Sequence, residues 1–376
     1  MEPGSGPEIV QKRRVASLVR VTSTGWDSAG FGEAVQAALD AFLDEQAERL
    51  APLGGDAARL VDEARRSVSG GKRFRAAFCF WGYRAVRPEP VDEAALVRAC
   101  AALELLHASA LVHDDLMDAS DTRRGRPATH RQFERDHRGD GWRGDPEQYG
   151  GAAAILLGDL LLSWADELLR RCGLPLEQVA PALDVFDLCR SEVIAGQFLD
   201  VSVQARGRAD VDTAMTVLRY KSAKYSIERP LHIGAALAGA SAATMAELSA
   251  FGLPLGEAFQ LRDDLLGVYG DPATTGKPAG DDLVEGKRTV LVALALDGAA
   301  DADAALLDAA LGSPLSVPQV ERLRAVIDSS GAHEQVEAVI GELAGLAVAA
   351  LGRADLDPHA ATVLRALASA ATDRAL

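Results

Sequence analysis

Residues 101–125 of this 376-residue chain read AALELLHASALVHDDLMDASDTRRG, an apolar run that ends in acids and then in two arginines. The apolar spacing predicts a buried helix that the acids terminate. On such a helix Asp114 and Asp118 lie on one face, one turn apart, and Asp115 and Asp121 flank them. Because like charges packed so closely repel one another, the cluster costs stability unless a cation neutralises it.

These residue types favour a hard metal ion that has phosphate among its ligands. Carboxylate oxygens prefer Mg²⁺ or Ca²⁺ to zinc. Arg123 and Arg124, just beyond the acids, suggest that phosphate oxygens supply the other ligands of the metal. The simpler alternative is a solvated acidic helix end, which would be favoured for an isolated DDxxD pattern. The apolar run that leads directly into the acids argues against that alternative.

The composition limits the classes of protein to which the chain can belong. Hydrophobic residues make up 48% of it, which is ample for a large core in one domain or two. The net charge of −16 argues against a nucleic-acid partner. The most apolar run, residues 150–165, holds Asp159 in its middle, so we expect no stable membrane insertion. Residues 3–14 lack a secretory segment, and four widely spaced cysteines without a ligand pattern suit a reduced, cytoplasmic protein: Cys79, Cys100, Cys172 and Cys189.

Lysine is rare in this chain, and its positions are informative. Only six of the 39 Lys and Arg residues are lysines, so lysine should persist where a compact point charge on a phosphate oxygen is needed. Five of the six lie in motif-like strings: GGKRFR at 70–75, KSAKY at 221–225, GKP at 276–278 and GKRT at 286–289. Chance clustering is the alternative. An acidic protein that binds an anion must concentrate its positive charge, and these are the candidate positions.

The pattern predicts an all-α fold. Ala, Leu, Glu and Arg dominate, aromatic residues are only 5%, and strand-like alternation is absent. Residues 120–147, rich in Arg, Asp and Gly, are interpreted as a long connection over a site, and the region after about residue 300 as packing support. The predicted helices lie near residues 30–50, 55–68, 72–86, 92–119, 147–171, 176–202, 210–223, 225–239, 242–268, 288–298, 303–311, 317–329, 332–351 and 358–373.

A second acidic cluster ends another apolar helical run. Residues 259–271 read FQLRDDLLGVYGD, about 150 residues after the first cluster. Alone, Asp263 and Asp264 could be a solvent-exposed pair at a helix end. Two acid-ended apolar helices instead suit a pair that face each other across a cavity and offer carboxylates to shared metal ions.

Taken in order from about Gly70 to Thr289, these motifs resemble the all-trans (E) polyprenyl diphosphate synthases, the family of farnesyl and geranylgeranyl diphosphate synthases. The resemblance implies the isoprenoid synthase fold, a large helix bundle around a central apolar cavity. It implies one domain over residues 29–376 after a variable segment 1–28, and a homodimer. The implied substrates are isopentenyl diphosphate and an allylic diphosphate, which is dimethylallyl, geranyl or farnesyl diphosphate.

The resemblance also assigns roles to single residues. Lys72, Arg75, His107 and Arg124 would contact the isopentenyl diphosphate, although His107 could instead be a core histidine. Asp114 and Asp118 would hold two Mg²⁺ ions and Asp263 a third, with Asp115 and Asp264 completing the two catalytic motifs. Gln197 and Asp200 would support the site from a neighbouring helix, whereas Lys224 has no family role and is expected in a surface ion pair. The residues expected to clamp the allylic diphosphate are Arg123, Lys221, Ser222, Gln260, Lys277 and Lys287.

The implied reaction explains these residue types. The allylic diphosphate loses pyrophosphate to give a carbocation, the isopentenyl double bond attacks it, and a proton leaves. Pyrophosphate leaves only when its charge is neutralised, which about three Mg²⁺ ions and several cationic side chains can do. No protein base is required, because the departed pyrophosphate can accept the proton.

One position departs from the family pattern. The second motif normally reads DDxxD, and Gly267 replaces its third acid here. Asp263 can still coordinate a metal, and Asp271, one further turn along a continued helix, is a partial substitute. On this interpretation Gly267→Asp should be tolerated or mildly activating.

The helix before the first motif also bears on product length. The growing tail should run from the aspartates past Ala110 and then Leu106, about 12 Å away. Ser109 and Ala110 are small, and a bulky aromatic there stops growth early in this family. This favours geranylgeranyl diphosphate, with farnesyl or a longer product as the alternative.

Three other functions stay open at this point. A class I terpene cyclase would need no isopentenyl site, so Lys72, Arg75 and Arg124 argue against it. A non-catalytic partner subunit of a prenyl synthase has only Gly267 in its favour. A metal-free helical scaffold leaves the placement of the lysines unexplained.

Overall fold

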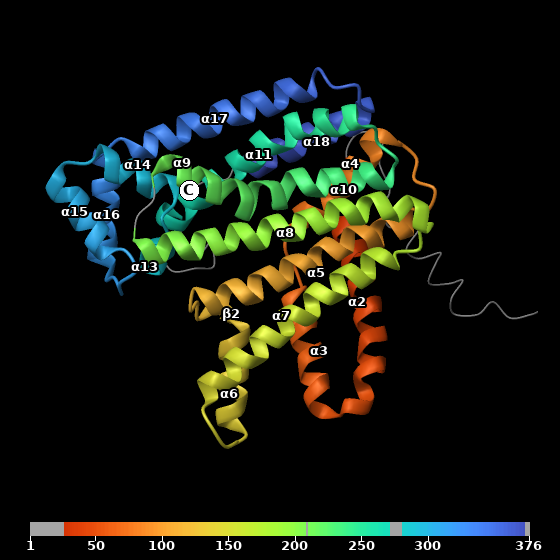
Figure 1. Ribbon diagram of the computed structural model, residues 1–376, viewed down its shortest axis with the longest axis horizontal. Helices are drawn as coiled ribbons and strands as arrows, with labels where there is room; N and C mark the ends of the chain where they lie inside the picture. The colour runs from red at the N-terminus through yellow and green to blue at the C-terminus, as the bar shows by residue number, and fades with distance from the viewer. Residues whose placement is uncertain (1–25, 208–209, 271–279, 373–376) are drawn as a thin grey trace, which may run out of the picture. The chain divides into compact units, whose positions relative to one another are not determined.

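A computed structural model describes residues 26–207, 210–270 and 280–372 (Figure 1). Over these residues the fold is all-α, as predicted, apart from a ribbon of two short strands, β1, Thr122–Arg123, and β2, Arg126–Pro127. The chain forms two compact units, which are described separately. The first holds the described residues up to 122 with residues 126–183 and 233–239, and the second holds residues 123–125, 184–232 and those from 240 on.

Some predictions cannot be compared with this structure. The polar start at 3–14, Asp271 and Lys277 lie outside the described residues. The single domain over residues 29–376 stays a prediction.

The first unit is built around α5, Glu93–Met117, which packs against α2, Ser28–Leu50, α4, Phe74–Val86, and α7, Pro146–Arg170. The Asp92 side chain begins α5 by accepting a hydrogen bond from the backbone NH of Ala95 at 2.9 Å. Alanine and leucine bury α5 on nearly every face up to Val112, as befits a helix inside a core. The other elements of this unit are η1, Ala51–Leu53, α3, Gly55–Ser67, and α6, Thr129–Gly139.

From the sequence we predicted no segment that resembles a membrane-spanning helix, but α5 is long and apolar enough to be one. Among the described residues α5 is the one helix with the length and hydropathy of a membrane span, and residues 150–165 lack them. In its most apolar window 78% of the residues are buried inside the protein, as in a core helix.

The second unit is built around α11, Ala242–Tyr269. α11 packs against η2, Leu218–Glu228, α13, Asp281–Glu285, α17, Ala332–Leu351, and α18, Pro358–Thr372. Leu261, Leu265 and Val268 of α11 share a core with residues after 320, so the predicted packing role of the C-terminal region is confirmed. The remaining elements of this unit are α9, Val211–Val217, α14, Val290–Gly298, α15, Asp301–Ala310, and α16, Val317–Ser329. Two helices contribute residues to both units, α8, Leu176–Arg206, and α10, Arg229–Leu237.

Two segments differ from the sequence prediction. Residues 120–147 are not one long connection, because they hold the β1–β2 ribbon and α6. α6 is mostly charged and buries only a narrow face around Phe133, so its composition resembles that of a loop. The predicted break near residue 224 is absent, because the π-helical segment η2 carries the chain from α9 into α10 without interruption.

Two glycines explain the close packing around η2. A Cβ atom built on Gly196 of α8 would lie 2.4 Å from the backbone nitrogen of Lys221. A Cβ atom built on Gly256 of α11 would lie 2.4 Å from the carbonyl oxygen of Ala223. Both helices therefore contact the η2 backbone directly. π-Helical turns are rare and often mark functional positions.

Candidate active site

The first aspartate motif lies where α5 ends. Asp114 and Asp115 belong to its last turn, and Asp118 caps it, with its backbone NH bonded to the carbonyl oxygen of Asp114 at 2.8 Å. The next residue, Ala119, has a φ of 52°, a left-handed conformation typical of a helix terminus. Asp115 is buried, whereas Asp114 and Asp118 are half-buried. The prediction of an acid-ended apolar helix is therefore confirmed in its geometry.

One face of α5 leads from these acids back along the helix. His107, Ala110 and Asp114 follow at spacings of three and four, so they share a face, and all three are half-buried. Leu106 and Ser109 beside them are buried. His107 is thus not a fully enclosed core histidine. The small side chains at 109 and 110 lie where the sequence analysis placed the path of the growing tail.

The GGKRFR string forms a tight loop before α4. Gly70, Gly71 and Arg73 all have positive φ values, of 70°, 90° and 54°. Glycine adopts this conformation without strain, and this explains the glycine pair. The loop leaves Lys72 exposed and places Arg75, half-buried, in the first turn of α4.

A buried ion pair anchors this loop to α5, and sequence reasoning missed it. Arg73 Nη1 lies 2.9 Å from Glu104 Oε2, and both side chains are only 6% exposed. Arg73 also donates to the carbonyl oxygen of Val68 at 2.7 Å and to the side-chain oxygen of Gln36 at 2.5 Å. Glu104 stands inside the apolar run of α5, and a charged residue at a core position was the available signal.

Arg123 and Arg124 lie at the turn of the β1–β2 ribbon. Arg123 is half-buried and Arg124 is exposed. Arg124 and Gly125 have φ values of 52° and 72°, which close the turn.

In the second unit, η2 carries Lys221 and Ser222, both half-buried. Lys221 Nζ donates to Asp200 Oδ2 of α8 at 2.6 Å, and Asp200 is buried. This contact agrees with the supporting role expected of Asp200. The amide nitrogen of Gln197, three residues before Asp200, is buried and has no hydrogen-bond partner among the described residues.

Lys224 was expected in a surface ion pair, but the pair is in fact largely buried. Its Nζ donates to Glu192 Oε1 at 2.8 Å, and Arg229 contacts the same carboxylate from Nε and Nη2 at 2.6 and 2.9 Å. Burial alone would raise the pKa of Glu192, but these hydrogen bonds lower it below the usual carboxyl value. The π-turn places Lys224 beside α8, which explains the difference.

The second aspartate motif lies within α11, five to six residues before the helix ends at Tyr269. Asp264 is buried and accepts a hydrogen bond from Gln260 Nε2 at 2.8 Å. Burial and the carboxylates of Asp282 and Asp263 raise the pKa of Asp264 to about 7. The surroundings of Asp264 therefore disfavour its charged form.

Gly267 changes the interpretation of this motif. A Cβ atom built on Gly267 would lie 1.9 Å from Oδ2 of Asp282, on α13. The carboxylate of Asp282 is held from its other side by Lys287 Nζ, 3.1 Å from Oδ1, and Lys287 also pairs with Glu285. A side chain at position 267 would therefore have to displace the Asp282 carboxylate. That Gly267→Asp is tolerated stays a prediction.

The family model of polyprenyl synthetases matches residues 58–327. This chain belongs to the polyprenyl synthetase family. It is 35% identical over 301 residues to the geranylgeranyl diphosphate synthase of Mycobacterium tuberculosis, covering 79% of each chain. It is also 35% identical over 273 residues to the short chain isoprenyl diphosphate synthase of Methanothermobacter thermautotrophicus, covering 72% of this chain and 77% of that protein.

A solved structure supports the same assignment. The geranylgeranyl pyrophosphate synthase of Corynebacterium glutamicum, complexed with isoprenyl diphosphate and magnesium, matches with a TM-score of 0.90 and 41% identity. The match covers 93% of this chain and all of that chain. The predicted family, the isoprenoid synthase fold and the prenyltransferase activity are therefore confirmed.

The donor set of this polyprenyl synthetase fits magnesium. Both aspartate motifs offer only oxygen ligands, which Mg²⁺ prefers. Among the described residues no three Asp, Glu, His or Cys side chains converge closely enough to hold a metal by themselves.

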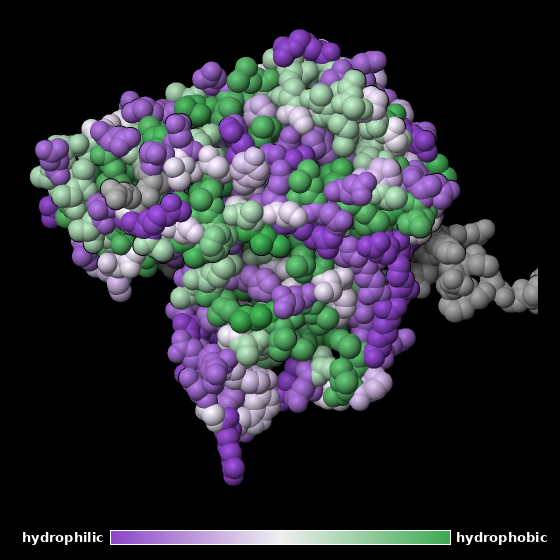
Figure 2. All heavy atoms as spheres, viewed as in Figure 1, coloured by the Kyte–Doolittle hydropathy of each residue, from purple (hydrophilic) through white to green (hydrophobic). Residues whose placement is uncertain are grey.

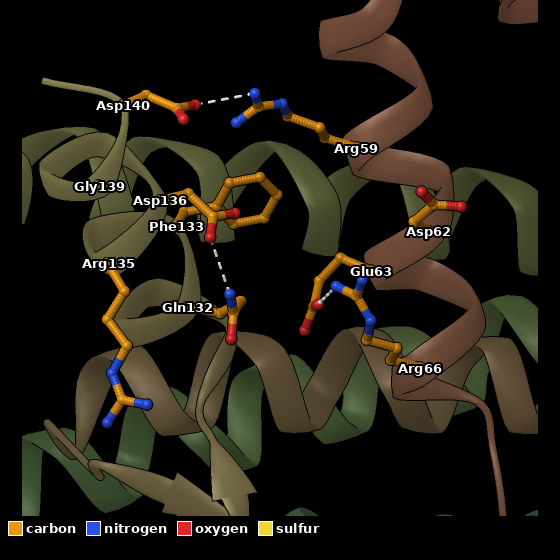
Figure 3. A pocket seen from close by; sticks show the side chains of 10 residues that line it. All are labelled: Arg59, Asp62, Glu63, Arg66, Gln132, Phe133, Arg135, Asp136, Gly139 and Asp140. Atoms are coloured by element: carbon orange, nitrogen blue, oxygen red, sulfur yellow. Dashed lines mark hydrogen bonds and ion pairs between the residues drawn. The ribbon is translucent and has the colours of Figure 1, made fainter. Parts of the chain in front are cut away.

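A pocket of about 290 Å³ between α3 and α6 of the first unit is not the active site (Figure 3). None of the predicted site residues lines it. Its charges are largely paired, Arg59 with Asp140 at 2.8 Å and Arg66 with Glu63 at 2.9 Å. This groove is therefore separate from the aspartate motifs, which stay the predicted site of catalysis.

Proposed function

We propose that this polyprenyl synthetase condenses isopentenyl diphosphate with dimethylallyl, geranyl and farnesyl diphosphate, and that its main product is geranylgeranyl diphosphate. The observation that carries the proposal is the loop of Lys72 and Arg75, which the Arg73–Glu104 ion pair anchors to the helix of the first aspartate motif. A cyclase has no use for a second diphosphate site. A product of four isoprene units agrees with the names of the relatives in Mycobacterium and Corynebacterium.

In this mechanism each set of residues has one task. Lys72, Arg75, His107 and Arg124 bind the isopentenyl diphosphate, with Lys72 exposed to meet it. Asp114, Asp118 and Asp263 would hold about three Mg²⁺ ions, which would neutralise the charge of the leaving pyrophosphate. The proton lost at the end passes to pyrophosphate, so no side chain has to act as a base. The residues that orient the allylic diphosphate are Arg123, Lys221, Ser222, Gln260, Lys277 and Lys287.

We also propose a homodimer. Ile155 and Leu156 on α7 are 50% and 61% exposed, and hydrophobic side chains gather over α7 in Figure 2, whereas α6 is largely hydrophilic. On α8, Ile194 and Phe198 are 57% and 73% exposed at a spacing of one turn. Large apolar side chains that are exposed together in this way are typical of a surface that a partner subunit covers. Light scattering after gel filtration should give twice the chain mass, and Phe198→Glu should reduce it.

We place the protein in the cytoplasm. All four cysteines are buried thiols that form no disulfide with one another. This suits a reducing compartment, because oxidising compartments favour disulfides. The localisation can be tested by fractionating cells that express the chain.

The decisive experiment supplies purified protein, Mg²⁺ and labelled isopentenyl diphosphate with each of the three allylic primers in turn. We expect incorporation with all three and a main product of geranylgeranyl length after hydrolysis. A main product of farnesyl or greater length would replace the proposed product. Absence of incorporation with every primer would overturn the synthase function in favour of a partner subunit, and release of a hydrocarbon would favour a cyclase.

A further inference from the structure

The second aspartate motif has a carboxylate near the place of its missing acid, and it comes from another helix. Position 267 lies one helical turn after Asp263, on the same face of α11. The space in which a side chain of residue 267 would begin is filled by the carboxylate of Asp282, with Oδ2 at 1.9 Å and Cγ at 2.4 Å from the ideal Cβ position. We infer that Asp282 supplies the carboxylate that residue 267 lacks and serves as the third acid of the second motif. This inference rests on the proposed function.

The spacing along α11 supports this role. Cβ atoms four residues apart on a helix are about 6 Å apart. The Asp282 carboxylate, at the Cβ position of residue 267, therefore lies within reach of a cation bound at Asp263.

The backbone of the short helix α13, which carries Asp282, is held in place by its neighbours. It is bounded by Gly280 and Gly286, with left-handed φ values of 73° and 76°. Leu283 is fully buried, and its carbonyl oxygen accepts a hydrogen bond from the backbone NH of Gly312 at 3.0 Å. The backbone NH of Lys287 donates to the carbonyl oxygen of Asp282 at 3.0 Å. The side chain of Asp282 is only 13% exposed.

The charges around Asp282 indicate a function beyond packing. Its Oδ1 is 3.1 Å from Lys287 Nζ, one of the residues proposed to clamp the allylic diphosphate. Its Oδ2 side is the side directed at Gly267 and α11. A cation bound between α11 and α13 would meet the Oδ2 side of this carboxylate, while Lys287 holds its Oδ1.

The test removes the carboxylate at position 282 and, in one variant, places a carboxylate at position 267 instead. Asp282→Asn removes the charge without changing the shape, and Gly267→Ala adds a methyl group that displaces Asp282 without replacing it. The double variant Gly267→Asp/Asp282→Ala moves the carboxylate to the position that the family uses. Asp281→Asn is the matched control, since it removes the same charge from the neighbouring residue of α13.

Two measurements are made on each full-length variant. The first is the Mg²⁺ concentration that gives half-maximal isopentenyl incorporation. The second, which needs no turnover, is the rise in melting temperature on adding Mg²⁺ with inorganic pyrophosphate, because a ligand of the folded state stabilises it. The melting temperature without ligand shows whether each variant folds.

We expect Asp282→Asn and Gly267→Ala to need about tenfold more Mg²⁺, or more, and to lose most of the thermal shift. The double variant should regain both, and Asp281→Asn should behave as wild type. If Asp282→Asn lowers only the unliganded melting temperature and keeps the full ligand-induced shift, Asp282 is a packing residue and the inference is wrong. The inference is equally wrong if the double variant recovers nothing over Asp282→Asn. A wild-type protein that shows the thermal shift but no incorporation with any primer would overturn the proposed function alone.

Discussion

Removal of the Glu104 carboxylate should both destabilise the protein and loosen the loop that carries Lys72. Glu104 and Arg73 are each 6% exposed and 2.9 Å apart, and Arg73 has no other acidic partner among its hydrogen bonds in the described structure. Removal of one partner leaves a buried charge uncompensated, which costs about 3–5 kcal/mol. Glu104→Ala should therefore lower the free energy of unfolding by about this amount.

Urea denaturation followed by circular dichroism measures this loss. The exposed pair Arg170–Asp166 on α7 provides a control, since Arg170→Ala should cost less than about 1 kcal/mol. The double variant Arg73→Met/Glu104→Leu removes both charges and should recover much of the stability. In steady-state assays Glu104→Gln should raise the KM for isopentenyl diphosphate more than the KM for the allylic primer. A cost below about 1 kcal/mol for Glu104→Ala, or equal changes in both KM values, would refute the anchoring role.

Three further predictions concern α5, which carries the first aspartate motif, and the buried ion pair between Glu192 and Lys224 of η2. Asp114→Ala should lower kcat by about a hundredfold or more with little change in melting temperature, because the residue ends α5 and is not part of its core; near-normal turnover would exclude it as a metal ligand. Ala110→Phe should shift the product toward farnesyl length, as measured by chromatography of the hydrolysed products, and an unchanged distribution would mean that the tail takes another path. The pKa of Glu192 is lowered because hydrogen bonds from Arg229 and Lys224 outweigh burial, so the stabilisation is present above the ordinary carboxyl pKa and is lost as the pH falls through the lowered value. Wild type should consequently lose more stability than Glu192→Gln between about pH 5 and pH 3 in urea titrations, and parallel curves would contradict this.

Local patterns predicted most of the fold, because helix starts and ends depend on nearby residues. The Asp92 cap and the acids after Met117 bound α5, as the spacing indicated. α6 was missed because a helix with so few apolar residues depends on packing against α7 rather than on its own periodicity. The π-helical η2 depends on close approach by α8 and α11, which no local pattern expresses.

In the candidate site, too, local patterns predicted some residues, whereas others depend on contacts between distant parts of the chain. Lysine scarcity and the acid spacing identified Lys221 and Asp114 from the sequence alone. The partner of Arg73 and the role of Asp282 both depend on contacts across the fold, Arg73 with Glu104 31 residues later and Gly267 with Asp282 of another helix. A glycine in an acidic motif was interpreted as a deficiency, whereas it makes room for a carboxylate from elsewhere in the chain.

The glycine contacts of η2 have a mechanical consequence. At Gly196 and Gly256 backbone meets backbone, with no side chain between them that could change rotamer and absorb a shift. Gly256 lies on the helix that carries Asp263 and contacts the backbone of Ala223, two residues after Lys221. Any side chain at position 256 would therefore change the spacing of the two segments that carry Asp263 and Lys221.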